Sequence, residues 1–335
     1  MELWYLGVSR VYLVDASGSM GGTEGIAELT APKIELVKGE LRQLLGDGLN
    51  FAMDDRVAVM AFKNRKGKPL VKTVLPFQYA RALDENFVHL INSISSINAE
   101  GGTPISMALR EALSLTAPEY GDREVLLITD ADYSLGEDPR LYVYDALMQH
   151  ATINVIYLGA SERLEMLESL ARRTGGTVRV VRRPVDLHRY LFYPPDPPPL
   201  DPYTEDLVSL AVSKIKEYKS PKPAEGTGSE WKLPDAGALE ELKALKLRLL
   251  KRQEDLGKEL AAMPLQRQEP LFKLMGIKQM LGRKRISKKD YLQRASEIEE
   301  ALGELVRAER SKRRALAVLD SLSADLDSIM GRARE

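Results

Sequence analysis

VYLVDASGSM, residues 11–20, places four apolar or aromatic residues directly before an aspartate and two serines. Residues 11–14 contain no polar alternation, which predicts a strand buried on both faces. Asp15 then stands at the carboxyl end of that strand, the edge where open parallel α/β sheets bind their ligands. Asp15, Ser17 and Ser19 are placed to direct oxygen atoms at one hard cation. The alternative interpretation is a helix N-cap, where Asp and Ser are also preferred.

The residues that follow alternate between strand and helix patterns as far as residue 192. This alternation predicts an α/β fold with a doubly wound, mainly parallel sheet. The predicted strands cover residues 56–62, 70–77, 123–130, 152–159 and 176–181, with 70–77 as a short edge strand, and the predicted helices cover 34–49, 83–97, 104–113, 139–149 and 162–174.

Two further oxygen donors occur at matching places in this pattern. Thr103 follows Gly101 and Gly102, which permit a tight backbone, and precedes Pro104, which suits the first turn of a helix. Asp130 ends an apolar strand, as Asp15 does. The sequence therefore predicts that Thr103 and Asp130 complete the site begun by the first stretch.

The combined pattern resembles the von Willebrand factor A family and its metal-ion-dependent adhesion site. It consists of D-x-S-G-S, then G-G-T-P, then an apolar strand ending in T-D, and the resemblance covers about residues 8–192. Each of the five site positions of the family is matched in this chain, by Asp15, Ser17, Ser19, Thr103 and Asp130. One departure is that Ala131 and Asp132 follow the last aspartate, where many members have glycine. Asp132 is interpreted either as part of a water shell or as a solvated loop carboxylate.

The resemblance implies a divalent cation, Mg²⁺ or Mn²⁺, and a division of roles among the five residues. Ser17 and Ser19 would bind the cation through their hydroxyl groups, and Thr103 would do so in one conformational state. Asp15 and Asp130 would act mostly through water. Neutral hydroxyl ligands leave the cation electrophilic, so that an Asp or Glu of a partner protein can complete its coordination.

Composition and missing motifs set limits on the function. The 335 residues include no cysteine, which excludes disulfides, thiolate nucleophiles and cysteine-ligated metals. A signal-peptide pattern and an apolar stretch of about 18 residues were not found, so a cytoplasmic protein without membrane contact is expected. At Asp15, Ser17 stands where the D-x-D motif of aspartyl-phosphate phosphatases has its second aspartate, and G-x-S-x-G and G-x-x-x-x-G-K-[ST] motifs do not occur. We therefore expect no enzyme activity, and any energy input would come from a partner.

The sequence predicts three regions: a von Willebrand factor A domain over 1–192, proline-rich linkers with one short helix over 193–237, and a helical hairpin or small bundle over 238–335. The proline-rich start of the linker is read as a stiff spacer, or alternatively as a polyproline ligand. Leucines of the last region follow three- and four-residue steps, as in helices that pack against one another. Packing within the chain, self-association and docking of a partner helix are the alternatives for this coiled-coil-like seam.

Two functions follow from these observations. The first is a metal-dependent protein interaction module, an adaptor in a cytoplasmic complex. Intracellular prokaryotic members of the family resemble partners of AAA+ ATPases of the MoxR type, to which they present targets. The alternative is a nucleic-acid-associated structural protein, because residues 238–335 carry 22 Lys and Arg against 16 Asp and Glu. No aromatic residues interleave the basic runs at 283–289 and 307–314, which makes nucleic acid the less favoured partner.

Overall fold

Residues 11–14 lie within strand β1 (Val8–Asp15), and all four are fully buried. Val11 and Leu13 belong to the apolar core on one face of the sheet, whereas Tyr12 and Val14 belong to the core on the other face. Alternate side chains of a strand point to opposite faces. The prediction of a strand buried on both faces is confirmed.

The sheet has six strands in the order β3-β2-β1-β4-β5-β6. β1 pairs in parallel with β2 and with β4, the pairs β4·β5 and β5·β6 are also parallel, and β3 is an antiparallel edge strand. The predicted mainly parallel sheet with an edge strand is therefore confirmed. The further strands are β2 (Arg56–Arg65), β3 (Lys68–Tyr79), β4 (Asp122–Thr129), β5 (Ala151–Leu158) and β6 (Val178–Val181).

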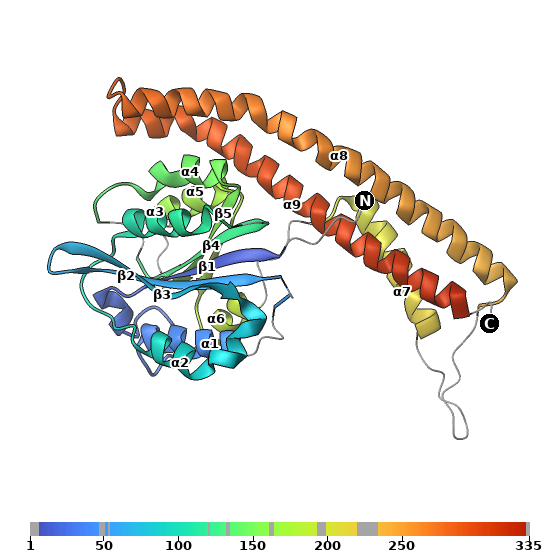
Figure 1. Cartoon of the computed structure of the whole chain (residues 1–335), viewed down its shortest axis with the longest axis horizontal. Coiled ribbons are helices and arrows are strands. Elements are labelled where there is room, and N and C mark those ends of the chain that lie inside the picture. The colour runs from blue at the N-terminus through green and yellow to red at the C-terminus, as the bar shows by residue number, and fades with distance from the viewer. Residues whose placement is uncertain are drawn as a thin grey trace. The chain divides into compact units, whose positions relative to one another are not determined.

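Helices cover both faces of this sheet, as the predicted doubly wound fold requires. Figure 1 shows α3, α4 and α5 on one face and α1, α2 and α6 on the other. Their bounds are α1 (Lys33–Gly46), α2 (Phe87–Ser95), α3 (Ile105–Thr116), α4 (Val143–Met148), α5 (Glu165–Arg173) and α6 (Pro184–Phe192), with 3-10 turns η1 (Gly18–Gly21), η3 (Ala80–Asn86) and η4 (Pro139–Tyr142).

This computed structural model describes residues 7–46, 51–52, 54–119, 121–131, 135–160, 164–192, 199–219 and 234–332. Most of the two predicted linkers, and Asp132, lie outside the described residues. Three described helices follow residue 192 in the sequence, namely α7 (Pro202–Lys219), α8 (Ala236–Gly282) and α9 (Lys288–Arg332). No described helix combines the length and the apolar character that crossing a membrane requires.

The chain forms two compact units, and α8 and α9 each contribute to both. The sheet unit comprises Met1–Asp196 and Gln268–Val306, and the helical unit comprises Pro197–Arg267 and Arg307–Glu335. In the helical unit the predicted leucine seam packs helix against helix, because leucines of α8 and α9 share one apolar cluster with α7. These are Leu242, Leu245, Leu249 and Leu256 on α8, Leu316, Leu319 and Leu326 on α9, and Leu207 on α7.

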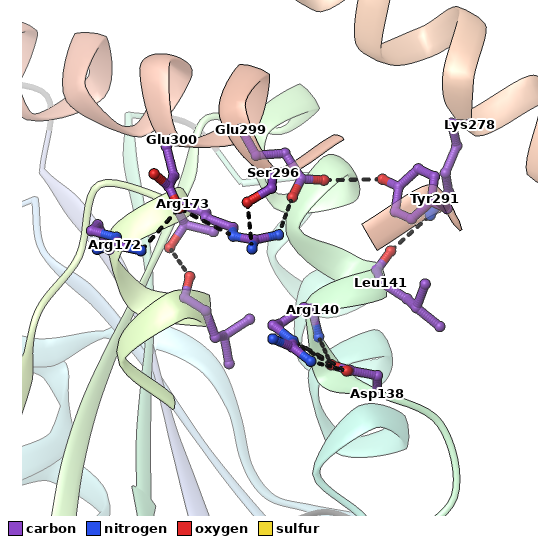
Figure 2. A network of polar contacts seen from close by, with 12 residues as sticks. Asp138, Arg140, Leu141, Arg172, Arg173, Lys278, Tyr291, Ser296, Glu299 and Glu300 are labelled. Atoms are coloured by element: carbon purple, nitrogen blue, oxygen red, sulfur yellow. Dashed lines mark hydrogen bonds and ion pairs between the residues drawn. The ribbon is translucent and has the colours of Figure 1, made fainter. Parts of the chain in front are cut away.

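Within the sheet unit, the tip of the α8–α9 hairpin packs against the helices on one face of the sheet. Tyr291, Ala295 and Leu302 of α9 are buried in the same core as Val11. Figure 2 shows the polar part of this contact, in which Arg173 Nη1 donates to Glu299 Oε2 over 3.0 Å and Tyr291 donates to Glu299 Oε1 over 3.1 Å. The apolar seam of α9 continues through these residues. Here it packs on the helices that cover the sheet as well as on α8.

Gly303 explains how closely α9 approaches α5. A Cβ atom added at Gly303 would lie 2.3 Å from the carbonyl oxygen of Arg172. Only glycine fits such a separation. The approach brings Arg172 and Arg173 to within 2.9 and 3.0 Å of Glu300 and Glu299 respectively.

Candidate metal centre

The two predicted carboxylates leave neighbouring strands at one edge of the sheet. Asp15 is the last residue of β1, and Asp130 follows directly after β4. β1 and β4 are parallel, with Val14 opposite Ile128. Because this register places the two strand ends side by side, Asp15 and Asp130 meet where the loops leave the sheet, as the sequence predicted.

Hydrogen bonds connect four of the five predicted residues. The hydroxyl oxygens of Ser17 and Ser19 lie 3.1 Å apart, and Ser19 donates to Asp130 Oδ1 over 2.7 Å. Asp15 Oδ1 accepts the backbone N–H of Ser17 over 2.8 Å. Asp15 Oδ2 accepts the hydroxyl of Thr129 over 2.6 Å.

One side of the cluster is buried in the protein, and the other side is exposed to solvent. Asp15 and Ser17 are buried, with exposed fractions of 0% and 1%, whereas Ser19 is exposed. Burial raises the pKa of Asp15 to about 7; hydrogen bonds from Thr129 and Ser17 oppose this rise, and the charge of Asp130 adds to it. A dissolved ion can therefore reach the cluster at Ser19.

Lys33, the first residue of α1, places an ammonium group in the cluster. Its Nζ lies 2.7 Å from Asp130 Oδ2, and the exposed fractions of the two side chains are 7% and 2%. A buried carboxylate is costly unless a cation compensates its charge. Lys33 compensates one carboxylate here, so that an ionised Asp15 would leave the cluster one negative charge in excess.

The loop that carries Thr103 is held against the first loop by backbone hydrogen bonds. Gly18 donates to the Gly101 carbonyl over 2.8 Å, and Asn64 donates to the Gly102 carbonyl over 2.7 Å. Gly101 has φ +74°, and an added Cβ would lie 1.6 Å from the Asn64 carbonyl oxygen. Glycine is therefore required at 101 by backbone conformation and by space. Thr103 itself, two residues after Gly101, is buried, and its carbonyl accepts from the Leu135 N–H over 2.9 Å.

These donors suit a hard cation such as Mg²⁺. Adjacent oxygens around an octahedral Mg²⁺ lie about 3 Å apart, because each bond is about 2.0–2.1 Å long. The separations of 3.1 Å between Ser17 and Ser19 and 2.7 Å between Ser19 and Asp130 approach this spacing. Groups of three or more His, Cys, Asp or Glu suited to a metal do not occur among the described residues, so the hydroxyl groups would have to supply part of the coordination.

The helix N-cap interpretation of the first stretch is not supported. The 3-10 turn η1 does begin after Ser17, but the Ser17 side chain makes no capping hydrogen bond. Its hydroxyl instead contacts Ser19.

Sequence reasoning missed two members of the cluster. Thr129 directly precedes Asp130 and donates to Asp15, and its hydroxyl at the end of the apolar run 125–128 was the available signal. Lys33 is the first residue of α1. The apolar pattern of this helix did not indicate the direction of the Lys33 side chain.

Known proteins share parts of this sequence. Residues 11–132 match the family model described as von Willebrand factor type A domain. A Bacillus subtilis (strain 168) protein titled "Uncharacterized protein YwmC" is 29% identical over 172 residues, which are 49% of this chain and 72% of that protein.

Two solved structures are similar to part of this chain. The conserved hypothetical protein BatB from Bacteroides thetaiotaomicron has 18% identity and a TM-score of 0.43, over 56% of this chain and 96% of that one. A von Willebrand factor type A structure from Catenulispora acidiphila has 19% identity and a TM-score of 0.44, over 56% of this chain and 41% of that one. The family match spans all five predicted site residues, and it supports the interpretation of this part of the sheet unit as a von Willebrand factor type A domain.

Proposed function

We propose that the sheet unit binds a partner protein through a divalent cation, Mg²⁺ or Mn²⁺, at the candidate metal centre. One observation carries this proposal: two carboxylates and two serine hydroxyls converge at the ends of adjacent parallel strands, and Ser19 leaves the cluster open to solvent. The bound cation would supply an electrophile for a carboxylate of the partner.

The residues of the centre have distinct proposed roles. Ser17 and Ser19 offer hydroxyl oxygens without adding negative charge, and Thr103 offers a third hydroxyl from the start of α3. Asp130 compensates the positive charge. The proposed role of Asp15 is indirect: it is fully buried, and it accepts from the Ser17 N–H and the Thr129 hydroxyl.

The proposed role is non-enzymatic and cytoplasmic. A module that recognises a carboxylate through a metal suits an adaptor, which brings a target to a second protein. A MoxR-type AAA+ ATPase is our proposed motor in such a complex. Exposed apolar side chains of α8, such as Leu247, Leu265 and Phe272, are where self-association or a partner helix would be sought.

Replacing Thr103 with alanine tests whether the metal serves recognition. Thr103→Ala should retain the fold and should weaken binding of a native partner at least tenfold, about 1.4 kcal/mol. The partner is first captured from the source cells with intact protein in Mg²⁺ and identified by mass spectrometry, and its dissociation constant is then measured for both proteins. Chelator should weaken binding to the intact protein by the same factor.

Thr116→Ala is the matched control, because Thr116 is a buried threonine at the other end of α3. Its hydroxyl donates to the Leu113 carbonyl, so its loss should lower stability and leave partner binding unchanged. A partner that binds equally well to Thr103→Ala, and in the presence of chelator, would show that the centre is structural.

A further inference from the structure

The β2–β3 hairpin beside the candidate metal centre has a strongly basic face. Residues 63–72 include five cationic and no acidic residues. Arg65 lies opposite Lys68 and Ala61 lies opposite Lys72, and residues opposite one another in an antiparallel pair share a face. Because positions 61, 63 and 65 alternate along β2, Lys63, Arg65, Lys68 and Lys72 all belong to this face.

The hairpin is attached directly to the loops of the centre. The Ala16 N–H donates to the Phe62 carbonyl over 2.8 Å, and the Asn64 N–H donates to the Gly102 carbonyl over 2.7 Å. Lys63 Nζ donates to the Asn98 carbonyl over 3.0 Å. The hairpin, whose turn is the blue loop at the left of Figure 1, thus begins next to the residues that flank Ser17 and Thr103.

The positive charge of this face is only partly compensated within the described residues. Glu100 pairs with Lys63 at 2.8 Å and lies 3.4 Å from Arg65. The hydrogen bond and charge of Lys63, with the charges of Arg65 and Lys66, lower the pKa of Glu100. The described part of the chain provides no carboxylate contact for Lys66, Lys68 or Lys72, which are all exposed.

Protection of the sheet edge does not account for the whole face. Lysines on an edge strand prevent pairing with another chain, and this explains Lys68 and Lys72 on β3. Lys63 and Arg65 lie on the inner strand β2, and Lys66 lies in the turn. Arg65 opposite Lys68 is moreover an unfavourable like-charge pair. An external anion would relieve that repulsion.

We propose that the basic face and the metal centre form one docking surface for an acidic peptide segment of a partner protein. This inference rests on the proposed function: one carboxylate of the segment occupies the metal, and further carboxylates pair with Lys66, Lys68 and Lys72. A protein ligand fits better than a nucleic acid, because residues 63–72 include no aromatic side chain on which a base could stack.

The test measures fluorescence polarisation of three labelled probes in Mg²⁺. Two are twelve-residue glycine-serine peptides, one with a single glutamate and one with four, and the third is an oligothymidylate with the same number of charges as the four-glutamate peptide. The triple variant Lys66→Gln, Lys68→Gln, Lys72→Gln should bind the four-glutamate peptide at least tenfold more weakly than the unmodified protein. Its affinity for Mg²⁺, measured by calorimetry, should be unchanged.

Two matched variants separate charge from position and from folding. Arg283→Gln, Lys284→Gln, Lys289→Gln removes three exposed charges at the tip of the α8–α9 hairpin and should change binding less than twofold. Lys66→Arg, Lys68→Arg, Lys72→Arg keeps the charge and should retain binding. Circular dichroism of all three variants checks that the sheet unit is folded.

Other outcomes would overturn the docking surface, the proposed function or the choice of an acidic peptide as ligand. Normal Mg²⁺ binding with unchanged peptide binding by the glutamine variant would overturn the docking surface and leave the proposed function intact. Peptide binding that persists in chelator would overturn both. Equal or tighter binding of the oligothymidylate would overturn the choice of an acidic peptide in favour of a phosphate polymer.

Discussion

Two clusters of buried charge in the sheet unit differ in their balance of charge and in their exposure to solvent. Around Glu299 there is one buried carboxylate, and its two oxygens accept from Arg173 and from Tyr291. The metal centre instead holds two carboxylates, three hydroxyl groups and a single ammonium, that of Lys33. Burial raises the pKa of Glu299 and of Asp15 alike.

The features that separate the candidate metal centre from the Glu299 cluster are its balance of charge and its exposure to solvent. The presence of a buried charged group does not distinguish the clusters, because each contains a fully buried carboxylate. Each carboxylate oxygen accepts a hydrogen bond in both clusters, but the Glu299 cluster pairs one carboxylate with one guanidinium, and Glu299, Arg173 and Tyr291 are all buried. With Asp15 ionised, the metal centre has one negative charge in excess, and it has one exposed hydroxyl, that of Ser19; this combination favours an external cation.

The largest expected effect is on the closed cluster. Glu299→Ala removes the carboxylate that pairs with the buried guanidinium of Arg173 at 3.0 Å, and removing one partner of a buried ion pair costs about 3–5 kcal/mol. Urea denaturation followed by circular dichroism measures the loss. Glu300→Gln is the control, since Arg172 is exposed and Glu300 half-buried, and ion pairs near the surface contribute about 1 kcal/mol or less. Equal effects of the two variants would remove the distinction between buried and exposed pairs at this helix contact.

A second, smaller effect separates the clusters by their response to metal. Mg²⁺ at a hundredfold excess over its dissociation constant should stabilise the unmodified protein by about 2.7 kcal/mol, because it binds only the folded state. Asp130→Asn should abolish this gain, and Glu299→Gln should retain it. Thermal melts in Mg²⁺ or Mn²⁺ and in chelator measure both. A melting temperature that is the same in metal and in chelator for the unmodified protein would contradict the metal centre.

The smallest effect concerns the ammonium inside the metal centre. Lys33→Met should tighten Mg²⁺ binding about tenfold, about 1.4 kcal/mol, because the cation no longer competes with Lys33 for Asp130. Lys38→Met is the control: Lys38 is equally buried on α1 but pairs with Glu35. Isothermal titration gives the dissociation constants. Weaker binding in Lys33→Met would mean that Lys33 supports the metal rather than opposing it.

The sequence predicted the sheet and the position of the centre because both depend on local patterns. An apolar run ending in aspartate fixes where Asp15 and Asp130 leave their strands, and a parallel register then brings them together. The glycines before Thr103 predicted a tight loop. The structure shows that the backbone conformation of Gly101 and its closeness to the Asn64 carbonyl allow only glycine there. Whether these residues bind a metal remains a prediction.

Contacts between distant segments could not be predicted in the same way. Tyr291, Ala295 and Leu302 have the same helical spacing as the leucines of the helical unit, yet they pack on the sheet unit. Periodicity shows that a helix has an apolar face, but it does not show what covers that face. The sequence also did not distinguish Lys33 from Lys38, because whether either side chain points toward Asp130 depends on how α1 packs.

Gly303 fixes the rotational phase of α9 where it passes α5. Successive residues of an α-helix are rotated by about 100°, so shifting α9 by one residue would bring Leu302 or Glu304 toward the place of Gly303. A side chain there would meet the Arg172 carbonyl, which lies 2.3 Å from the position of an added Cβ. An insertion or deletion between the hairpin tip and Gly303 therefore cannot be absorbed by sliding the helix, and the spacing from Lys288 to Gly303 is a fixed length in any redesign of this chain.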